Sequence, residues 1–242
     1  MVERRILHII PVDAPGERIE RVRRYLHGLA HGGTQVDVMA LPGGPSDLEY
    51  HIDGHRAVSM VIDRLTGREL SYDGILVGCF YDPGVRELRE ALDVPVMGVG
   101  EGSMLVASCL GHRFSILVGR RKWIPKMSDN ALRYGFDRRI ASWRPVGVTV
   151  KLLHEDPKGT YNTLLEAGRA AVRDDGAEVI ILGCAAMEDT AGQLQQELGC
   201  PVVDPVAAGF KVIETLADLR VRLNLSTSKL YDYESRGEGE EV

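Results

Sequence analysis

Apolar residues alternate along the chain between short continuous runs and longer stretches in which they recur every three or four positions. The short runs predict strands buried on both faces, and the periodic stretches predict helices with one apolar face. The predicted strands span residues 5–10, 36–41, 75–77, 94–99, 114–118, 146–153, 178–182 and 202–203. The predicted helices span residues 19–29, 85–92, 104–110, 128–134, 160–174, 193–198 and 207–223. Residues 46–65 are predicted to be helical throughout or to carry a loop before a helix. This alternation is typical of an α/β fold with mainly parallel sheets.

Two of the apolar runs end in the same Gly-Cys pair. Cys79 follows the first run and Cys184 follows the second, 105 positions later, and residues 88–96 match residues 194–202 at an offset of 106. We interpret the match as an internal duplication of a unit of about a hundred residues, which is large enough to hold its own core. The sequence therefore predicts a first lobe (1–110 with 207–225), a second lobe (111–206) and an unpacked, disordered acidic tail (226–242).

The two equivalent cysteines are the candidate catalytic residues. Each ends a buried strand just before a helix, where open α/β sheets carry their functional groups. On two similar lobes, Cys79 and Cys184 would face each other across a cleft, one removing a proton from a carbon acid as thiolate and the other returning one to the opposite face. The resulting enolate needs fixed N–H donors. The donors predicted from their positions are the backbone N–H groups of Phe80, Tyr81, Ala185 and Ala186.

Two further loops are predicted to contact the substrate, because each follows the first strand of its lobe. They supply Pro11 and Val12 in the first lobe and Gly119 and Arg120 in the second, where the adjacent basic residues could pair with a carboxylate. A cysteine at the end of a buried strand is more often a small core residue. The symmetric pair favours catalysis, whereas Cys109 and Cys200 are interpreted as core residues.

Composition and charge exclude several classes of partner. The chain of 242 residues has 29 basic and 35 acidic residues and a net charge of −6, with no basic stripe interleaved with aromatics, so nucleic acid is not a predicted partner. No apolar run approaches the ~20 residues of a membrane helix, and the N-terminus leads directly into a strand, so the chain is predicted to be cytoplasmic, with no membrane partner.

Cofactor and metal motifs are also missing from the sequence. The run Gly98-x-Gly100-x-Gly102 has Ser103 where a dinucleotide loop needs its third glycine, so NAD is not predicted. The four cysteines form no Cys-x-x-Cys pair and have no His spacing for zinc. The sequence therefore predicts no cofactor and no metal, and its candidate ligand is a small-molecule carbon acid.

The segments around both cysteines resemble the Asp/Glu/hydantoin racemase superfamily, and most closely its hydantoin and allantoin racemase branch. The resemblance covers the chain up to about residue 220, and the motifs that carry it are residues 78–84, 98–101, 110–116, 182–187 and 203–208. It implies two pseudosymmetric, Rossmann-like α/β lobes, each with a parallel four-stranded sheet flanked by helices, and an active site in the cleft between them. It also implies cofactor-independent two-base racemisation, with Cys79 and Cys184 as the acid/base pair, and assembly into a homo-oligomer.

Two loops depart from the family's pattern. The first-strand loop reads Pro11-Val12-Asp13-Ala14 in place of an Asn-Pro-Asn-Thr type sequence, and Gly119-Arg120 replaces a pair of threonines. Both loops are predicted to face the substrate, so a hydantoin, an allantoin and an acidic amino acid all stay open as substrates. A cis-trans isomerase or decarboxylase of a small dicarboxylic acid is the alternative on the same scaffold, although decarboxylases of this kind keep only the second cysteine. A non-catalytic ligand-binding protein is the alternative from another class.

Overall fold

The protein divides by its internal contacts into two compact units. The computed structural model describes residues 3–67 and 70–235. Unit 1 comprises Met1–Gly78, Pro83–Gly98 and Phe210–Val242, and unit 2 comprises Cys79–Asp82 and Val99–Gly209. The four residues that begin with Cys79 therefore leave unit 1 after the first Gly-Cys strand and pack within unit 2.

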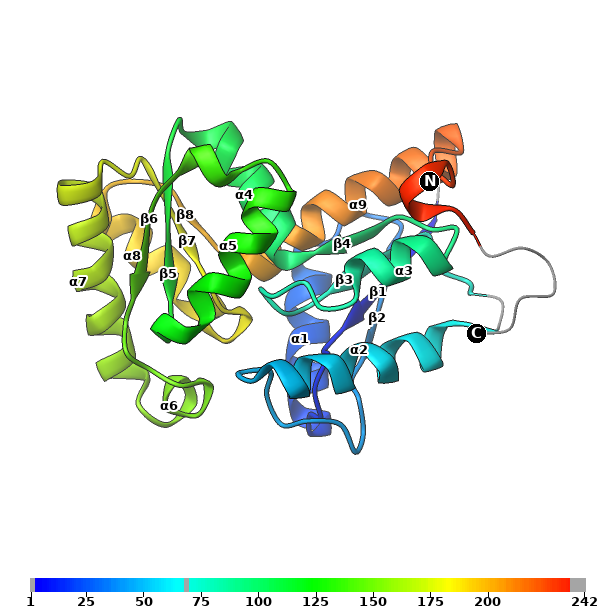
Figure 1. Cartoon of the computed structure of the whole chain (residues 1–242), viewed down its shortest axis with the longest axis horizontal. Helices are drawn as coiled ribbons and strands as arrows, with labels where there is room; N and C mark the ends of the chain where they lie inside the picture. Colours follow the sequence, from blue (N-terminus) through cyan, green and yellow to red (C-terminus); the bar gives the residue numbers. More distant parts are fainter. Residues whose placement is uncertain (1–2, 68–69, 236–242) are drawn as a thin grey trace. The chain divides into compact units, whose positions relative to one another are not determined.

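Unit 1 is built on a four-stranded parallel sheet with the strand order β2-β1-β3-β4. The strands are β1 (Arg4–Ile9), β2 (Thr34–Met39), β3 (Gly74–Val77) and β4 (Val96–Gly98). Right-handed crossovers place α1 (Gly16–Leu29) on one face and α2 (His51–Leu65) and α3 (Val85–Ala91) on the other (Figure 1). The long helix α9 (Pro205–Leu223) joins this unit from Phe210 onwards.

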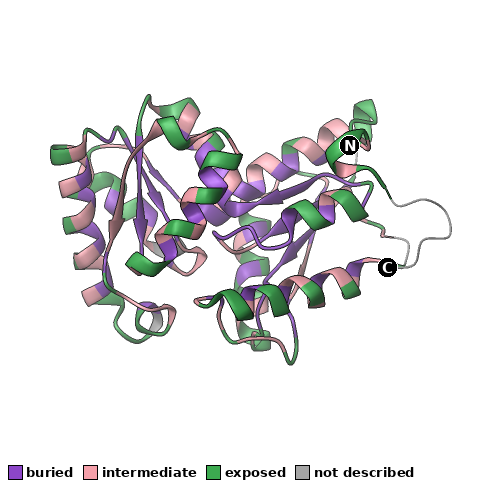
Figure 2. Cartoon of the chain, viewed as in Figure 1, coloured by how far each residue is buried: buried purple, intermediate pink, exposed green. Residues whose placement is uncertain are grey.

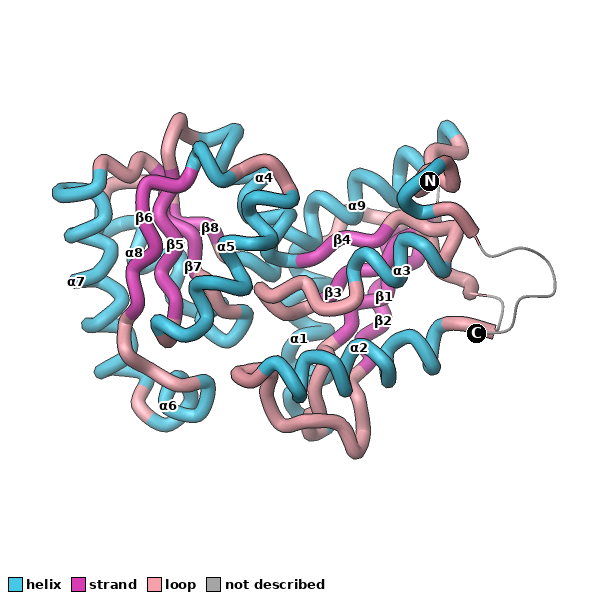
Figure 3. Tube along the Cα trace, viewed as in Figure 1, coloured by secondary structure: helices cyan, strands magenta, loops and turns pink. Residues whose placement is uncertain are grey.

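Unit 2 repeats this topology, with a parallel sheet in the order β6-β5-β7-β8. Its strands are β5 (Phe114–Val118), β6 (Ile140–Pro145), β7 (Val179–Leu182) and β8 (Val202–Val203). Its helices are α4 (Val99–Leu110), α5 (Ile124–Arg133), α6 (Val150–Glu155), α7 (Pro157–Asp175) and α8 (Ala191–Leu198), with short 3₁₀ helices η1 (Arg121–Trp123), η2 (Asp137–Arg139) and η3 (Ala185–Thr190). The predicted α/β fold with two four-stranded parallel lobes is confirmed (Figure 3).

The inner strands form the centre of each core. Every residue of β3, β5 and β7 is buried, and Figure 2 shows buried strands at the centre of each sheet. Strands covered on both faces need apolar residues at consecutive positions. This is why the continuous apolar runs predicted these three strands to within about a residue.

The edge strand predicted at residues 146–153 is wrong. The edge strand is instead β6, and the predicted stretch includes the first residues of α6. Thr149 caps α6, because its side-chain oxygen accepts a hydrogen bond from the Leu152 N–H at 3.2 Å. Within β6, Ser142 and Arg144 both bind Asp175, at 2.5 and 2.6 Å. These polar residues interrupt the apolar pattern, because an edge strand is covered less completely than an inner one.

Several helices begin elsewhere than predicted. Helix α4 begins at Val99 instead of 104, and α5 begins at Ile124 instead of 128. Helix α2 begins at His51 after a loop, one of the two arrangements that the sequence left open for residues 46–65. Helix α4 also packs within unit 2, whereas the sequence assigned residues 99–110 to the first lobe. The start of α4 was predicted too late because its first turn contains two glycines, which have low helix propensity.

The chain after α9 does pack, where the sequence predicted an unpacked tail. Lys229 Nζ donates to the carbonyl oxygens of Arg89 and Glu90 at 2.8 and 2.7 Å, and Arg86 pairs with Asp232 at 3.2 Å. Residues 226–235 thus lie along α3 and end in η4 (Tyr231–Tyr233). The rest of the predicted tail, 236–242, lies outside the described residues.

Candidate active site

Cys79 lies in a tight turn just after β3. The Gly78 N–H donates to the Ile9 carbonyl at 2.8 Å, and a Cβ on Gly78 would lie 2.5 Å from Nε2 of the buried His8. The chain then turns so that the Asp82 N–H donates to the Cys79 carbonyl at 2.8 Å, with Asp82 at the positive φ of 48°. The sequence suggested that Cys79 lies at the N-terminus of the following helix. It does not, because α3 begins only at Val85.

The turn that carries Cys79 is held by α4 and α5. The Asp82 carboxylate accepts hydrogen bonds from the N–H groups of Gly100 and Glu101, both at 2.8 Å, and from the Tyr134 hydroxyl at 3.0 Å. Asn130 Nδ2 donates to the Tyr81 carbonyl at 2.7 Å. Asp82 therefore satisfies the first free N–H groups of α4, which helix N-termini leave without intrahelical partners.

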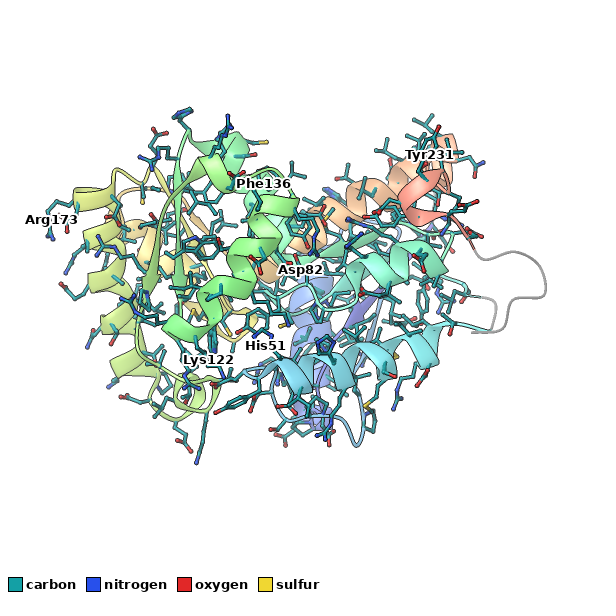
Figure 4. The ribbon with its side chains drawn as sticks, viewed as in Figure 1. His51, Asp82, Lys122, Phe136, Arg173 and Tyr231 are labelled. Carbon is teal, nitrogen blue, oxygen red and sulfur yellow. The ribbon has the colours of Figure 1, made fainter. Side chains whose placement is uncertain are left out.

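The Asp82 carboxyl is buried as well as hydrogen-bonded. Burial raises its pKa to about 7, although the bonds from Gly100, Glu101 and Tyr134 act in the opposite direction. The side chain is 7% exposed, so desolvation of the charged form dominates. The anchor of the Cys79 turn thus titrates near neutral pH (Asp82 is labelled in Figure 4).

Cys184 follows β7 in the same way that Cys79 follows β3. The Gly183 N–H donates to the Leu117 carbonyl at 2.8 Å, and a Cβ on Gly183 would lie 2.7 Å from that oxygen. The Met187 N–H donates to the Cys184 carbonyl at 3.1 Å, which begins η3. Ala185 and Ala186 are half-buried in this short helix, and Met187 enters the core of unit 2.

The two cysteines influence each other electrostatically within unit 2. Burial raises the pKa of Cys79 to about 12, and the negative charge of a Cys184 thiolate contributes to the rise. The Tyr81 N–H, which donates to the Cys79 sulfur, and the positive charge of Lys126 both lower this pKa. Because the Tyr81 N–H serves the sulfur itself, it is not the free enolate donor that the sequence predicted.

A pair of side chains from the start of α5 packs around Tyr81. Trp123 meets the Tyr81 ring edge-on, with 6.4 Å between ring centroids and an interplanar angle of 80°. Lys126 Nζ lies 4.5 Å from the centroid of the same ring. The sequence analysis did not identify Lys126, Asn130 and Asp82. The only signal for them in the sequence is that each is a polar residue within or beside an apolar segment.

The predicted substrate loops lie at the carboxyl ends of β1 and β5. In unit 1, Pro11 and Val12 are buried, and the Leu41 N–H donates to the Val12 carbonyl at 2.9 Å. In unit 2, Gly119 is buried against Trp123, whose ring would be 2.4 Å from a Cβ on Gly119, and Arg120 is half-buried. Unit 2 thus groups Gly119 with both cysteine segments, and the substrate contacts of all four loop residues stay predictions.

The described residues also bear on metals and membranes. Among residues 3–67 and 70–235, leaving aside the side chains of residues 154, 188 and 189, no cluster of three or more His, Cys, Asp or Glu side chains is arranged to hold a metal ion. No helix in the described part of the chain combines the length and apolar character that crossing a membrane requires.

Comparison with known proteins gives a consistent family. The model of the Asp/Glu/hydantoin racemase family matches residues 16–213. A protein named hydantoin racemase from Pseudomonas sp. (strain NS671) is 35% identical over 205 residues, which cover 84% of this chain and 81% of that protein.

Solved structures agree in fold over nearly the whole chain. The allantoin racemase from Pseudomonas fluorescens superimposes with a TM-score of 0.89 at 29% identity, covering 98% of this chain and 99% of that one. The allantoin racemase from Klebsiella pneumoniae gives a TM-score of 0.87 at 31% identity, covering 98% and 95%.

Proposed function

The chain belongs to the Asp/Glu/hydantoin racemase family, and from this membership we propose that it inverts the α-carbon of a small hydantoin-like or allantoin-like carbon acid. Membership confirms the resemblance that the two Gly-Cys motifs predicted, and it makes the protein an isomerase. Ring-closed ureides are the first substrates to test, because the similar proteins are named hydantoin and allantoin racemases. Acidic amino acids are the second class.

The proposed reaction uses Cys79 and Cys184 as a two-base pair. The thiolate of one takes the α-proton, and the electrons of that C–H bond move onto the adjacent carbonyl oxygen as an enolate. The thiol of the other then donates its proton to the opposite face of the carbon. The product is the mirror image of the substrate, and the two sulfurs have exchanged protonation states.

The observation that carries this proposal is the repeated Gly-Cys strand end, because both cysteines pack within unit 2 and the charge of Cys184 contributes to the raised pKa of Cys79. Charge repulsion disfavours two thiolates, so at most one of the pair is ionised, as the reaction requires. Burial, which raises the pKa of Cys79 to about 12, opposes a thiolate at Cys79 itself. Both sulfurs also follow a glycine at the end of a fully buried strand, so the backbone around each is fixed by the core.

The enolate oxygen needs donors that are not already used. The Tyr81 N–H is engaged with the Cys79 sulfur, so the proposed donors are the N–H groups of Phe80, Ala185 and Ala186. Buried N–H groups stabilise charge as it develops on oxygen without having to reorient.

Isotope exchange tests the proposed function directly. Each enantiomer of allantoin and of a 5-monosubstituted hydantoin is incubated with the protein in D2O, and optical rotation and the α-proton NMR signal are followed. We expect loss of rotation together with deuterium at the α-carbon of at least one ring substrate. Aspartate, glutamate and maleate are tested in parallel. Turnover of maleate alone would replace the proposal with a cis-trans isomerase, and no exchange of any substrate would refute it.

A further inference from the structure

Lys126 is a partly buried cation whose charge is not neutralised by a neighbouring carboxylate. It lies on the first turn of α5, and its Nζ is 4.5 Å from the centroid of the Tyr81 ring. Within the part of the chain that the structure describes, no carboxylate lies within ion-pair distance of it. Burial lowers the pKa of Lys126, so an ammonium at this position is disfavoured unless an anion stands nearby.

Lys126 and the Cys79 thiol influence each other's ionisation. The positive charge of Lys126 lowers the pKa of Cys79, and the negative charge of Cys79 raises the pKa of Lys126. Tyr81 connects the two groups, because its N–H donates to the Cys79 sulfur while its ring lies under the Lys126 ammonium. Lys126 and Tyr81, from two separate segments of the chain, therefore both act on the Cys79 sulfur.

A second buried donor lies one helical turn before Lys126. Trp123 is 3% exposed, and its indole N–H has no acceptor among the described residues. Positions three apart share one face of a helix, and both side chains contact Tyr81. Trp123 and Lys126 thus place an indole N–H and an ammonium group beside the Cys79 turn. Both groups interact favourably with negative charge.

We propose that Lys126, held over the ring of Tyr81, is the positioning residue that supplies the counter-charge when the Cys79 sulfur carries negative charge. This inference rests on the proposed function, because it assigns Lys126 a role in the ionisation of one of the two proposed bases.

Alkylation of individual cysteines tests the role of Lys126 independently of racemisation. The full chain is treated with iodoacetamide from pH 6 to pH 11, and the modified Cys79 and Cys109 peptides are quantified by mass spectrometry. Lys126→Met keeps the unbranched stem over Tyr81 and removes the charge. We expect it to slow alkylation of Cys79 about tenfold at a fixed pH below the midpoint, which corresponds to a rise of about one pH unit in its profile.

Two further variants separate charge from packing. Lys126→Arg keeps the positive charge and is expected to stay within about threefold of the natural chain. Lys158→Met removes an exposed lysine from α7 of the same unit and is expected to leave the Cys79 profile unchanged. Cys109 is exposed, so its prediction as a core residue is wrong, and it should react equally in all variants. Its reaction therefore corrects for the amount of reagent and for the general effect of pH on thiols.

The outcomes distinguish this inference from the proposed function. An unchanged Cys79 profile in Lys126→Met, or an equal shift in Lys158→Met, would overturn the role of Lys126. If the shift occurs but the natural chain racemises no substrate, Lys126 is upheld as the counter-charge of Cys79 and the proposed function fails. If the chain does racemise, the acid limb of kcat/KM in Lys126→Met should move to higher pH with the alkylation profile.

Discussion

The two cysteine turns have the same backbone design and different side-chain support. In each, a glycine ends a buried strand, a cysteine follows, and the N–H three residues after the cysteine donates to its carbonyl, at 2.8 Å from Asp82 and 3.1 Å from Met187. Asp82 then accepts two N–H groups of α4, whereas Met187 packs into the hydrophobic core of unit 2. A titratable anchor stands in one turn where an apolar anchor stands in the other.

This difference shows what an internal duplication preserves. The strand end and the turn depend on backbone geometry and repeat in both halves, whereas charged support depends on partners supplied by other elements. Tyr81, Lys126 and Asp82 bring charge and hydrogen bonds to the Cys79 turn, whereas the three residues that follow Cys184 are apolar. The two turns are therefore equivalent in backbone and different in the residues that follow the cysteine.

Removing one sulfur at a time is the strongest way to break the comparison. Cys79→Ser and Cys184→Ser should each lower racemisation about 10³-fold, within the range that general acid–base groups contribute. Each variant keeps one thiol, which reaches one face of the carbon, so each should exchange the α-proton of only one enantiomer in D2O. We expect the two variants to prefer opposite enantiomers, as measured by NMR.

Cys109→Ser is the matched control, because Cys109 is an exposed cysteine of unit 2 outside both turns. It should racemise like the natural chain. Full activity in either catalytic-cysteine variant, or exchange of the same enantiomer by both, would contradict the assignment of one base to each face.

Much of the fold could be predicted from the sequence, because the relevant forces are local or uniform. The inner strands β3, β5 and β7 need apolar residues on both faces, so each appears in the sequence as a continuous run of apolar residues. The duplication could be read from the repeated Gly-Cys pairs. The edge strand β6 could not, because its Ser142 and Arg144 are satisfied by Asp175, 31 or more residues away in sequence.

The sequence draws attention to the two Gly-Cys turns but not to the residues that hold them in place. Asp82 reads as a turn residue before Pro83, and only the position of α4 makes it a helix cap. Lys126 and Asn130 lie on an amphipathic helix whose polar residues are, from sequence alone, ordinary surface positions. Their functions follow from which element lies beside them, and a single sequence does not give that information.

The pH dependence of stability sharpens the contrast between the Asp82 and Met187 anchors. The pKa of Asp82 is raised in the folded chain from 3.8 to about 7, so the folded chain holds this proton more tightly than the unfolded chain does. Its contribution to the free energy of unfolding is fully present below pH 3.8, falls as the pH rises, and is lost above about pH 7. The size of this contribution is on the order of 4 kcal/mol, as an upper bound.

Urea unfolding of the natural chain and of Asp82→Asn between pH 3.5 and 8 measures this contribution. We expect the stability of the natural chain relative to Asp82→Asn to decrease as the pH rises. Met187→Leu, which keeps the volume of the apolar anchor, should track the natural chain at every pH. A difference between the natural chain and Asp82→Asn that does not vary with pH would mean that folding leaves the pKa of Asp82 unchanged.

Substitution of the glycines before the cysteines tests whether the backbone geometry that the two turns share excludes a side chain equally in both. A Cβ on Gly78 would lie 2.5 Å from His8 Nε2 and 2.9 Å from the Ile9 carbonyl oxygen, and one on Gly183 would lie 2.7 Å from the Leu117 carbonyl oxygen. Gly78→Ala and Gly183→Ala should therefore each lower the free energy of unfolding by about 1–3 kcal/mol, because a backbone oxygen cannot move aside as a side chain can.

Gly192→Ala is the control for the loss of a glycine as such. Gly192 lies in α8, where a Cβ would meet no described atom within 4 Å, so alanine there should stabilise the chain by up to about 1 kcal/mol through helix propensity. Urea unfolding at one pH compares the three variants. Similar losses at Gly78 and Gly183 would support a strand end conserved in both halves, whereas a loss at only one would mean that the two turns differ in backbone tolerance as well as in charge.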